Sequence, residues 1–352
     1  MTRSPQCMIF ALLLAACDGT VAGRVDAGPG GEGRTDGGNR DGGDRDSVDG
    51  DNGDGEGWLD HPELPFPERL SELGVFPDMA DPTHADPRAV SYTPAFPLWS
   101  NGSRKLRHVV LPSQVDNRTA DWGFPRGSVF LKTFFFGTDL SQPIETRVMR
   151  QGEQGWDYAV YAWRGDEAMR TDGRSHRVEV EGPEGSLDHE IPGRLACRAC
   201  HESSPSWILG FRELQLNHVA GGGEQTELER LGDLFTEGTP EVPDAIEQAD
   251  GETRAVLGYL EGNCVACHNG TTEGPNSTYD LSHRAALDSL IDQPAMSSGT
   301  IAGTRVIPGD ADNSVVILSM RGQIDADPMP PVGVQRIDDA MIDRISDWID
   351  AL

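Results

Sequence analysis

The chain is poor in basic residues. Among its 352 residues, 29 are Lys or Arg and 58 are Asp or Glu, which gives a formal net charge of -29 at pH 7. Nucleic acid is excluded as a partner, because binding to phosphates requires a basic surface. Such a chain stays soluble and attracts positively charged partners, of which a small basic electron carrier is one example.

The apolar run near the N-terminus is too short to cross a membrane. Residues 8–16 are apolar and follow Arg3, but a bilayer core needs about 20 such residues. A short apolar stretch behind a positive charge is typical of a secretory signal. Leu14-Ala15-Ala16-Cys17 also resembles the bacterial lipobox. We expect residues 1–17 to be a lipoprotein signal, with acyl chains on Cys17 anchoring an exported protein in the periplasm or on the cell surface. Ordinary cleavage beside an incidental cysteine is the alternative.

Residues 18–57 lack the apolar side chains that a core requires. Glycine and aspartate dominate, as in Asp49-Gly50-Asp51-Asn52-Gly53-Asp54. This composition predicts a disordered, self-repelling tether between the anchor and the folded part. The spacing of the aspartates departs from the EF-hand pattern, so it does not favour calcium binding.

Cysteine is scarce, and none is left for a structural disulfide. Cys7 and Cys17 fall in the targeting segment, and the other four form two C-x-x-C-H motifs. The first motif is Cys197-Arg198-Ala199-Cys200-His201, and the second is Cys264-Val265-Ala266-Cys267-His268. An exported chain without a disulfide is unusual, so we expect the four thiols to serve another purpose.

C-x-x-C-H is the attachment signature of haem c. Two thiols three positions apart reach both vinyl groups of one porphyrin, and the adjacent histidine ligates the iron. The motifs therefore predict two covalently bound haem c groups, attached through Cys197, Cys200, Cys264 and Cys267 and ligated by His201 and His268. A zinc ribbon would need a shorter gap between the cysteine pairs and leaves the histidines unexplained. A thioredoxin-like pair would need a βαβ pattern that the sequence does not show.

Methionine or histidine commonly fills the sixth position of a haem iron. Met329 lies in the proline-rich run Asp327-Pro328-Met329-Pro330-Pro331, after the second motif and before the last amphipathic segment. This placement predicts Met329 as the sixth ligand of the second haem, whereas Met320 ends an apolar run and is expected in the core. For the first haem, His218 is a candidate ligand, and an open iron is the alternative. Further candidates are Met149, Met169, His189 and Met296.

The residues after the tether predict an α+β fold, with a mainly antiparallel β domain over 58–195 and an α-helical dihaem cytochrome c region over 196–352. Aromatic and alternating segments at 127–136 and 177–181 indicate strands. Segments 145–150 and 156–163 flank a glycine-containing turn, which indicates a hairpin. Apolar residues recur at helical spacing in three later segments, 226–234, 253–260 and 338–352.

Several segments resemble a family of bacterial dihaem c-type cytochromes without a settled physiological role. The resemblance covers residues from about 66 to the end and is carried by segments 96–105, 110–112, 127–134, 144–147 and 209–217. Residues 308–314 and 329–331 and the helix around Trp348 are similar to class I cytochrome c domains. The resemblance implies haem binding and electron transfer, but it does not supply a substrate.

These observations predict an exported electron-transfer protein that relays electrons from a donor dehydrogenase to an acceptor cytochrome. Its two haems, attached at nearby points of the chain, are expected to lie close enough for an internal hop. A dihaem peroxidase with an open first haem is the alternative, although the short spacing of the motifs and the long β domain fit it poorly. The β domain could instead recognise a partner through Trp99 and Lys105, but Asn101-Gly102 there is more simply a structural turn.

Overall fold

The computed structural model describes residues 57–137, 139–182, 185–204, 206–242, 246, 250–271, 279–295, 302–324 and 328–352. The predicted signal segment, the lipidation site Cys17 and all of the predicted tether except Gly57 lie outside the described residues. Met296, a candidate ligand, lies outside them as well.

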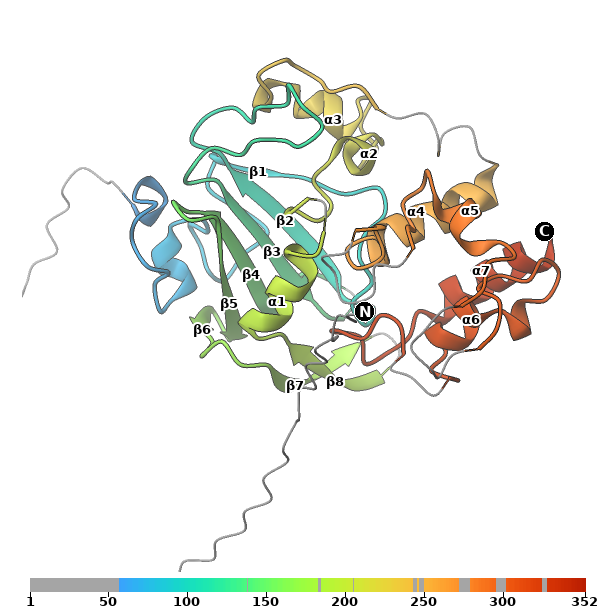
Figure 1. Ribbon diagram of the computed structural model, residues 1–352. Helices are drawn as coiled ribbons and strands as arrows, with labels where there is room; N and C mark the ends of the chain where they lie inside the picture. Colours follow the sequence, from blue (N-terminus) through green and yellow to red (C-terminus); the bar gives the residue numbers. More distant parts are fainter. Residues whose placement is uncertain are drawn as a thin grey trace, which may run out of the picture. The chain divides into compact units, whose positions relative to one another are not determined.

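A six-stranded antiparallel sheet organises the first half of the described chain (Figure 1). Its strands follow one another in sequence order, from β1 to β6. They are β1 (Ala89–Ser91), β2 (Arg104–Val110), β3 (Val129–Phe135), β4 (Pro143–Gln151), β5 (Trp156–Arg164) and β6 (Glu167–Arg170). A second, two-stranded sheet pairs β7 (His176–Gly182) with β8 (Gly185–Ile191). The hairpin predicted around the Gly152–Gly155 turn is confirmed by the pairing of β4 with β5.

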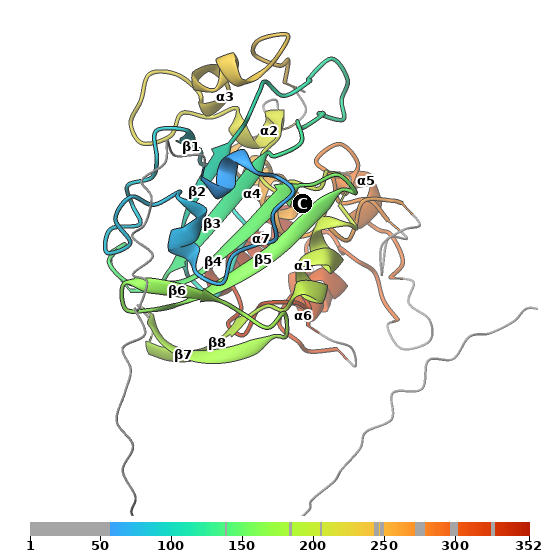
Figure 2. The same cartoon turned by 90° about the vertical axis from the view of Figure 1, so that its left-hand side faces the viewer.

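Each face of the large sheet has its own apolar core. One face packs against the segment from Trp58 to Phe76, which contains the short 3-10 helices η1 (Trp58–Asp60) and η2 (Leu70–Leu73). The other face, called the inner face below, carries Val109, Phe130 and Val160 and packs against residues from the chain after β8. Figure 2 shows η1 and η2 in front of the sheet and α4 and α7 behind it.

Short helices follow the strands. They are α1 (Arg194–His201), α2 (Glu213–Leu216), α3 (Glu227–Arg230), α4 (Gly251–Asn263), α5 (Ala286–Leu290), α6 (Val315–Met320) and α7 (Asp339–Asp350), with 3-10 helices η3 (Gly232–Leu234) and η4 (Ala311–Asn313). Side-chain caps begin the longer ones: Asp250 accepts hydrogen bonds from the first turn of α4, and Asp338 does so for α7. A third apolar core joins α4 to α7 and includes Met320, as predicted for that methionine. Among the described residues, no helix combines the length and apolarity needed to cross a membrane.

The predicted fold class, with an α-helical dihaem cytochrome region over 196–352, is wrong. The described chain is mostly antiparallel β, in two sheets, with only a few short helices. Helix α4 has 13 residues, but α2 and α3 have four each. Helical spacing at 226–234 correctly marked which side chains are buried, but it did not fix helix length. Helix α3 ends at Arg230, and the separate 3-10 helix η3 begins at Gly232.

Helix α4 is held against the β region by a close backbone approach. Gly258 and Gly262 lie on the same face of α4, and the residue packed over them is Phe96. A Cβ added at Gly258 would overlap the Phe96 ring, and one added at Gly262 would overlap the Phe96 backbone carbonyl. Only glycine therefore allows this approach, which places the end of α4, and with it Cys264, beside the segment before β2.

Gly262→Ala is expected to lower the free energy of unfolding by about 1–3 kcal/mol, because the added methyl group displaces backbone rather than a flexible side chain. Alanine is otherwise the better helix former, so the substitution without the overlap would be expected to raise the free energy of unfolding. Gly251→Ala in the same helix is the matched control, since a Cβ there meets nothing within 4 Å. Urea unfolding of both variants would test this, and equal stability of the two would contradict it.

Candidate functional site

Helix α1 places the first C-x-x-C-H motif against the inner face of the sheet. Gly193 precedes the helix at a position where a Cβ would overlap the backbone of Gly173 and Ser175. The helix packs beside β5. Cys197 is 8% exposed and belongs to the inner-face core, whereas Cys200 is half-buried. The local fold thus buries Cys197 against the sheet, while Arg198 and Ala199 of the motif stay exposed.

The imidazole of His201 is oriented by a backbone hydrogen bond. Its Nδ1 lies 2.6 Å from the carbonyl oxygen of Trp207. A carbonyl only accepts hydrogen bonds, so Nδ1 carries the proton and Nε2 is left with its lone pair for a metal. Burial lowers the pKa of His201 to about 4, which keeps the ring neutral at physiological pH. Ligating histidines in metal sites are commonly oriented in this way.

The second motif begins where α4 ends. Asn263, the last residue of α4, donates to the carbonyl of Tyr259 at 3.0 Å and accepts from the backbone N–H of Trp99 at 2.7 Å. Burial raises the pKa of the Cys264 thiol to about 12. His268 is buried, with its ring stacked on Tyr279 at a centroid distance of 4.7 Å. Both the thiol and the imidazole of this motif are therefore held in an apolar setting.

The fold brings the two motifs together. The side-chain amide of Asn269, directly after the second motif, donates to the carbonyl oxygen of Ser203, two residues after the first, at 2.7 Å. Burial raises the pKa of the Cys267 thiol, and the charge of Cys200 raises it further. The motifs are thus neighbours in space.

Met329 lies in a loop that is fastened at two points. Its backbone N–H donates to the carbonyl of Ser319 at the end of α6, at 3.0 Å. Farther along the loop, Asn101 accepts hydrogen bonds from the backbone N–H groups of Gln335 (2.7 Å) and Arg336 (3.0 Å). The indole of Trp99 donates to the carbonyl of Arg336 at 2.7 Å. The segment before β2 therefore contacts both Asn263, directly before the second motif, and the Met329 loop.

The turn predicted at Asn101-Gly102 is confirmed. Both residues have positive φ, 58° and 79°, and the N–H of Ser103 donates to the carbonyl of Ser100 at 2.9 Å. Because the Asn101 side chain is buried and fully engaged, this segment is a clamp between parts of the fold rather than an exposed recognition surface.

The candidate sixth ligands of the first haem are placed as follows. His218 Nε2 lies 2.8 Å from the carbonyl oxygen of Thr93, so it donates there and leaves only Nδ1 for a metal. His189 is fully buried and its Nε2 donates to Glu145 at 2.9 Å. Met149 belongs to the inner-face core, and Met169 is 39% exposed on β6.

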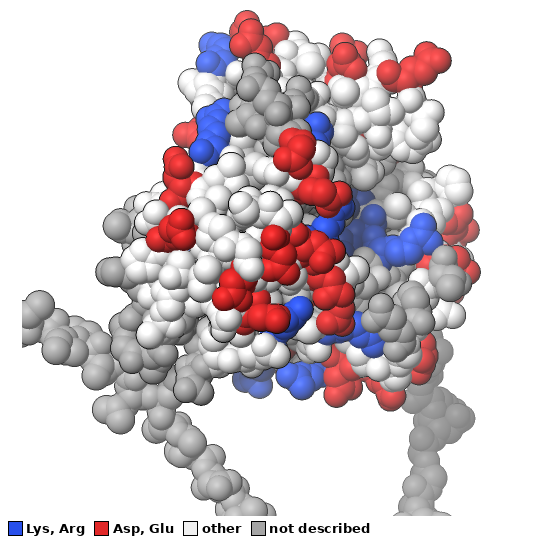
Figure 3. All heavy atoms as spheres, turned by 90° about the vertical axis from the view of Figure 1, so that its right-hand side faces the viewer, with Lys and Arg blue, Asp and Glu red and all other residues white. Residues whose placement is uncertain are grey.

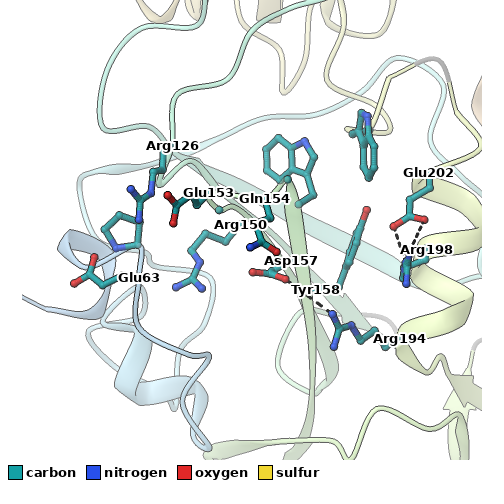
Figure 4. A pocket seen from close by; sticks show the side chains of 15 residues that line it. Glu63, Arg126, Arg150, Glu153, Gln154, Asp157, Tyr158, Arg194, Arg198 and Glu202 are labelled. Carbon is teal, nitrogen blue, oxygen red and sulfur yellow. Dashed lines mark hydrogen bonds and ion pairs between the residues drawn. The ribbon is translucent and has the colours of Figure 1, made fainter.

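A cavity of about 620 Å³ lies beside α1 (Figure 4). The turn between β4 and β5, the residues Pro62 and Glu63, and α1 form its walls. Arg198 and Glu202 make a bidentate ion pair at its edge. Tyr158 lines it, and its hydroxyl is buried without a hydrogen-bond partner in the described part of the chain. The cavity therefore borders the first motif, since Arg198 belongs to that motif and the Tyr158 ring lies 5.6 Å from the ring of His201.

The residues of both motifs fit haem c. None of the four cysteines in the described ranges forms a disulfide, and all four are at least half-buried. Within those ranges, no group of three or more His, Cys, Asp or Glu side chains is placed to hold a bare metal ion. A haem iron requires only one protein nitrogen per motif, because the porphyrin supplies the equatorial ligands. The neutral, oriented imidazole of His201 meets that requirement.

Sequence reasoning missed a row of cations on the inner face. Arg107 on β2, Lys132 on β3 and Arg147 on β4 are direct cross-strand neighbours. The signal in the sequence was Lys132, a charged residue within the apolar run of β3. It was overlooked because one charge in a strand does not reveal which residues lie opposite it.

Comparison of the chain with protein-family models, curated proteins and solved structures gives no match.

Proposed function

We propose that this protein is a dihaem c-type electron-transfer protein that is exported and attached to a membrane through Cys17. Cys197 and Cys200 would hold one haem and Cys264 and Cys267 the other, with His201 and His268 as iron ligands. Each thiol would add across a vinyl double bond, its hydrogen passing to the other vinyl carbon, so nothing is oxidised. A bound haem supplies a one-electron couple between ferric and ferrous iron. The proposal rests on the motifs and their geometry and does not require a helical cytochrome fold.

The observation that carries the proposal is the state of the first motif. Its histidine is neutral at physiological pH, with Nδ1 donating to the Trp207 carbonyl; Cys197 is buried, Cys200 is half-buried, and neither forms a disulfide. If the C-x-x-C-H motif held no cofactor, placing two thiols and an imidazole together out of solvent would serve no chemical purpose. The same combination orients a proximal ligand and excludes water from a haem edge.

The hydrogen bond between Asn269 and Ser203 supports internal electron transfer. Because the residues that follow the two motifs are in direct contact, the two haems would lie close to each other. Met329 is the proposed sixth ligand of the second haem, where a thioether raises the reduction potential. The net charge of -29 favours positively charged redox partners. We propose a donor dehydrogenase and an acceptor cytochrome as these partners.

Replacing either cysteine pair by serine is expected to reduce the haem content from two per chain to one. The change would be made as Cys197→Ser with Cys200→Ser, and separately as Cys264→Ser with Cys267→Ser. Intact mass and the pyridine haemochrome spectrum report covalent haem directly. A wild-type chain without covalent haem, matured in a host that attaches haem c, would sink the proposal.

A dihaem peroxidase is the second candidate, favoured by the cavity beside Tyr158. It requires an open iron at the first site, where small reactants could arrive through that cavity. Carbon monoxide added to the reduced protein separates the two functions. If neither haem binds the gas, both irons are six-coordinate and the relay function stands; if one binds it, peroxide turnover becomes the leading function.

A further inference from the structure

The inner face of the sheet carries an excess of positive charge next to the first motif. Lys105, Arg107, Lys132 and Arg147 all lie on this face, because they alternate in register with residues of the inner-face core. The carboxylate among them is Glu145, which pairs with Arg147. These five residues are called the cationic row below.

The cationic row contains two like-charge pairs in direct cross-strand register, Arg107 with Lys132 and Lys132 with Arg147. Like charges directly opposite each other destabilise a sheet. Within the described chain, neither Arg107 nor Lys132 has an ion-pair partner. Three cations instead surround one ring: Lys105 Nζ, Lys132 Nζ and Arg147 Cζ lie 5.6, 5.3 and 4.2 Å from the centroid of Phe134.

Burial makes this arrangement costly. Burial lowers the pKa of Lys132 to about 7, and the charges of Arg147 and Arg107 lower it further. The pKa of Lys105 is also well below its usual value, mainly through burial. The whole chain contains only two lysines, Lys105 and Lys132, and both lie in the cationic row. In an acidic chain, such a buried cluster is expected where an anion binds.

The first motif lies within electrostatic range of the cationic row. Burial raises the pKa values of the Cys197 and Cys200 thiols, while the charges of Arg147 and Lys132 act in the opposite direction. The same two cations act on His201. In the view of Figure 3, acidic side chains are spread over the face that carries α5 and α7, and basic ones occur at several separate places on it.

We propose that the cationic row binds the propionate carboxylates of the haem attached to Cys197 and Cys200 and raises the reduction potential of that haem. This inference rests on the proposed function. A haem carries two carboxylates, and the four cations of the row outnumber the one carboxylate of Glu145 by three. Positive charge beside the iron favours the ferrous state over the ferric state, because the ferrous haem carries one positive charge less.

The test is a potentiometric titration of the dihaem protein and of Lys132→Met, followed by optical absorption. We expect both proteins to contain two haems. The potential of the first haem should be lower in the variant, and that of the second haem should stay unchanged. The variant that lacks Cys264 and Cys267 identifies which potential belongs to the first haem. Lys105→Met serves as a second variant and should shift the same potential in the same direction. Arg104→Met is the matched control, because Arg104 neighbours Lys105 on β2 but points to the other face.

Each other outcome has a defined meaning. If both lysine variants contain two haems and the reduction potential of the first haem is unchanged in both, the cationic row does not bind the propionates. The proposed function would be unaffected by that outcome. Absence of covalent haem from the wild-type protein would overturn both. If Lys132→Met binds carbon monoxide and the wild-type protein does not, Lys132 is an iron ligand rather than a partner of the propionates, which also overturns the inference.

Discussion

Glu145→Ala is expected to lower the free energy of unfolding of the protein by about 3–5 kcal/mol. Glu145 is 0% exposed, and its carboxylate accepts two hydrogen bonds from Arg147, at 2.9 and 2.6 Å, and one from His189 at 2.9 Å. Removing it deprives the half-buried guanidinium of Arg147 and the buried imidazole of His189 of the acceptor that they share. Urea unfolding followed by circular dichroism measures the loss.

The control for this variant is an ion pair of similar geometry at the surface. Glu252 accepts two hydrogen bonds from Arg344, at 2.7 and 3.1 Å, but the two side chains are 63% and 45% exposed. Glu252→Ala should therefore change stability little, because solvent screens exposed pairs. If the two variants lost equal stability, burial of the Glu145 pair would not be the cause.

The Glu145 contribution should also depend on pH. Burial opposes ionisation of Glu145, but the charge of Arg147 and the hydrogen bond from His189 outweigh it and lower the pKa from 4.5 to about 2. A carboxylate with a depressed folded-state pKa stabilises the fold above its unfolded pKa, and this stabilisation is lost as pH falls towards the folded value. The stability difference between wild type and Glu145→Ala should thus be full above pH 4.5 and shrink towards pH 2. A difference that stays constant over this range would contradict the assignment.

Local patterns in the sequence predicted elements better than they predicted fold class. The β4–β5 hairpin followed from two β-rich segments around a glycine-containing turn, and the register then placed Arg147 opposite Val160. Helical spacing at 338–352 gave the buried face of α7, with Ile342, Ile345, Trp348 and Ile349 all buried. Leu352, expected on the same face, is 49% exposed because α7 ends at Asp350. The helical content predicted for residues 196–352 was too high, because a single helical turn followed by a loop can also place apolar residues at helical spacing.

The candidate site was only partly visible in the sequence. The two motifs identify the thiols and histidines without any structure, because their spacing is itself the chemical requirement. Nothing in the spacing reveals that Trp207 accepts the hydrogen bond from His201, or that Ser203 meets Asn269. The cationic row depends on cross-strand register, which a single sequence leaves open when strands are long and uniform.

One hydrogen-bond network connects the cationic row to the Met329 loop. His189 donates from Nε2 to Glu145 at 2.9 Å, and its Nδ1 accepts from the Asn101 amide at 3.3 Å. Asn101 in turn holds Gln335 and Arg336 in the loop that follows Met329. A change at either end can therefore affect the other, and the effects of Glu145 and Asn101 variants should not be additive.

Asn101→Ala is expected to destabilise the protein by about 2 kcal/mol, because it removes the acceptor of two part-buried backbone N–H groups and places alanine at positive φ. Asn101 is 1% exposed with φ 58°. Asn101→Gly separates the two causes, since glycine tolerates this backbone conformation but makes no side-chain hydrogen bond. Asn117→Ala is the control: Asn117 also bridges two backbone groups, Gly238 and Glu237, but in an exposed loop.

If Met329 ligates a second haem as we propose, the Asn101 variants should also alter that haem. With the Met329 loop released, the thioether is expected to leave the iron, so that the potential of this haem falls and the reduced protein binds carbon monoxide. Asn101→Gly should show this change as clearly as Asn101→Ala, because both lose the hydrogen bonds to Gln335 and Arg336. Optical spectra with and without the gas provide the measurement, and Met329→Ala gives the reference for a lost ligand. If Met329→Ala itself changed neither the potential nor gas binding, Met329 would not be the ligand. If Met329→Ala changed the potential and gas binding but the Asn101 variants did not, Met329 would remain the proposed ligand. The hydrogen bonds of Asn101 would then contribute to stability only.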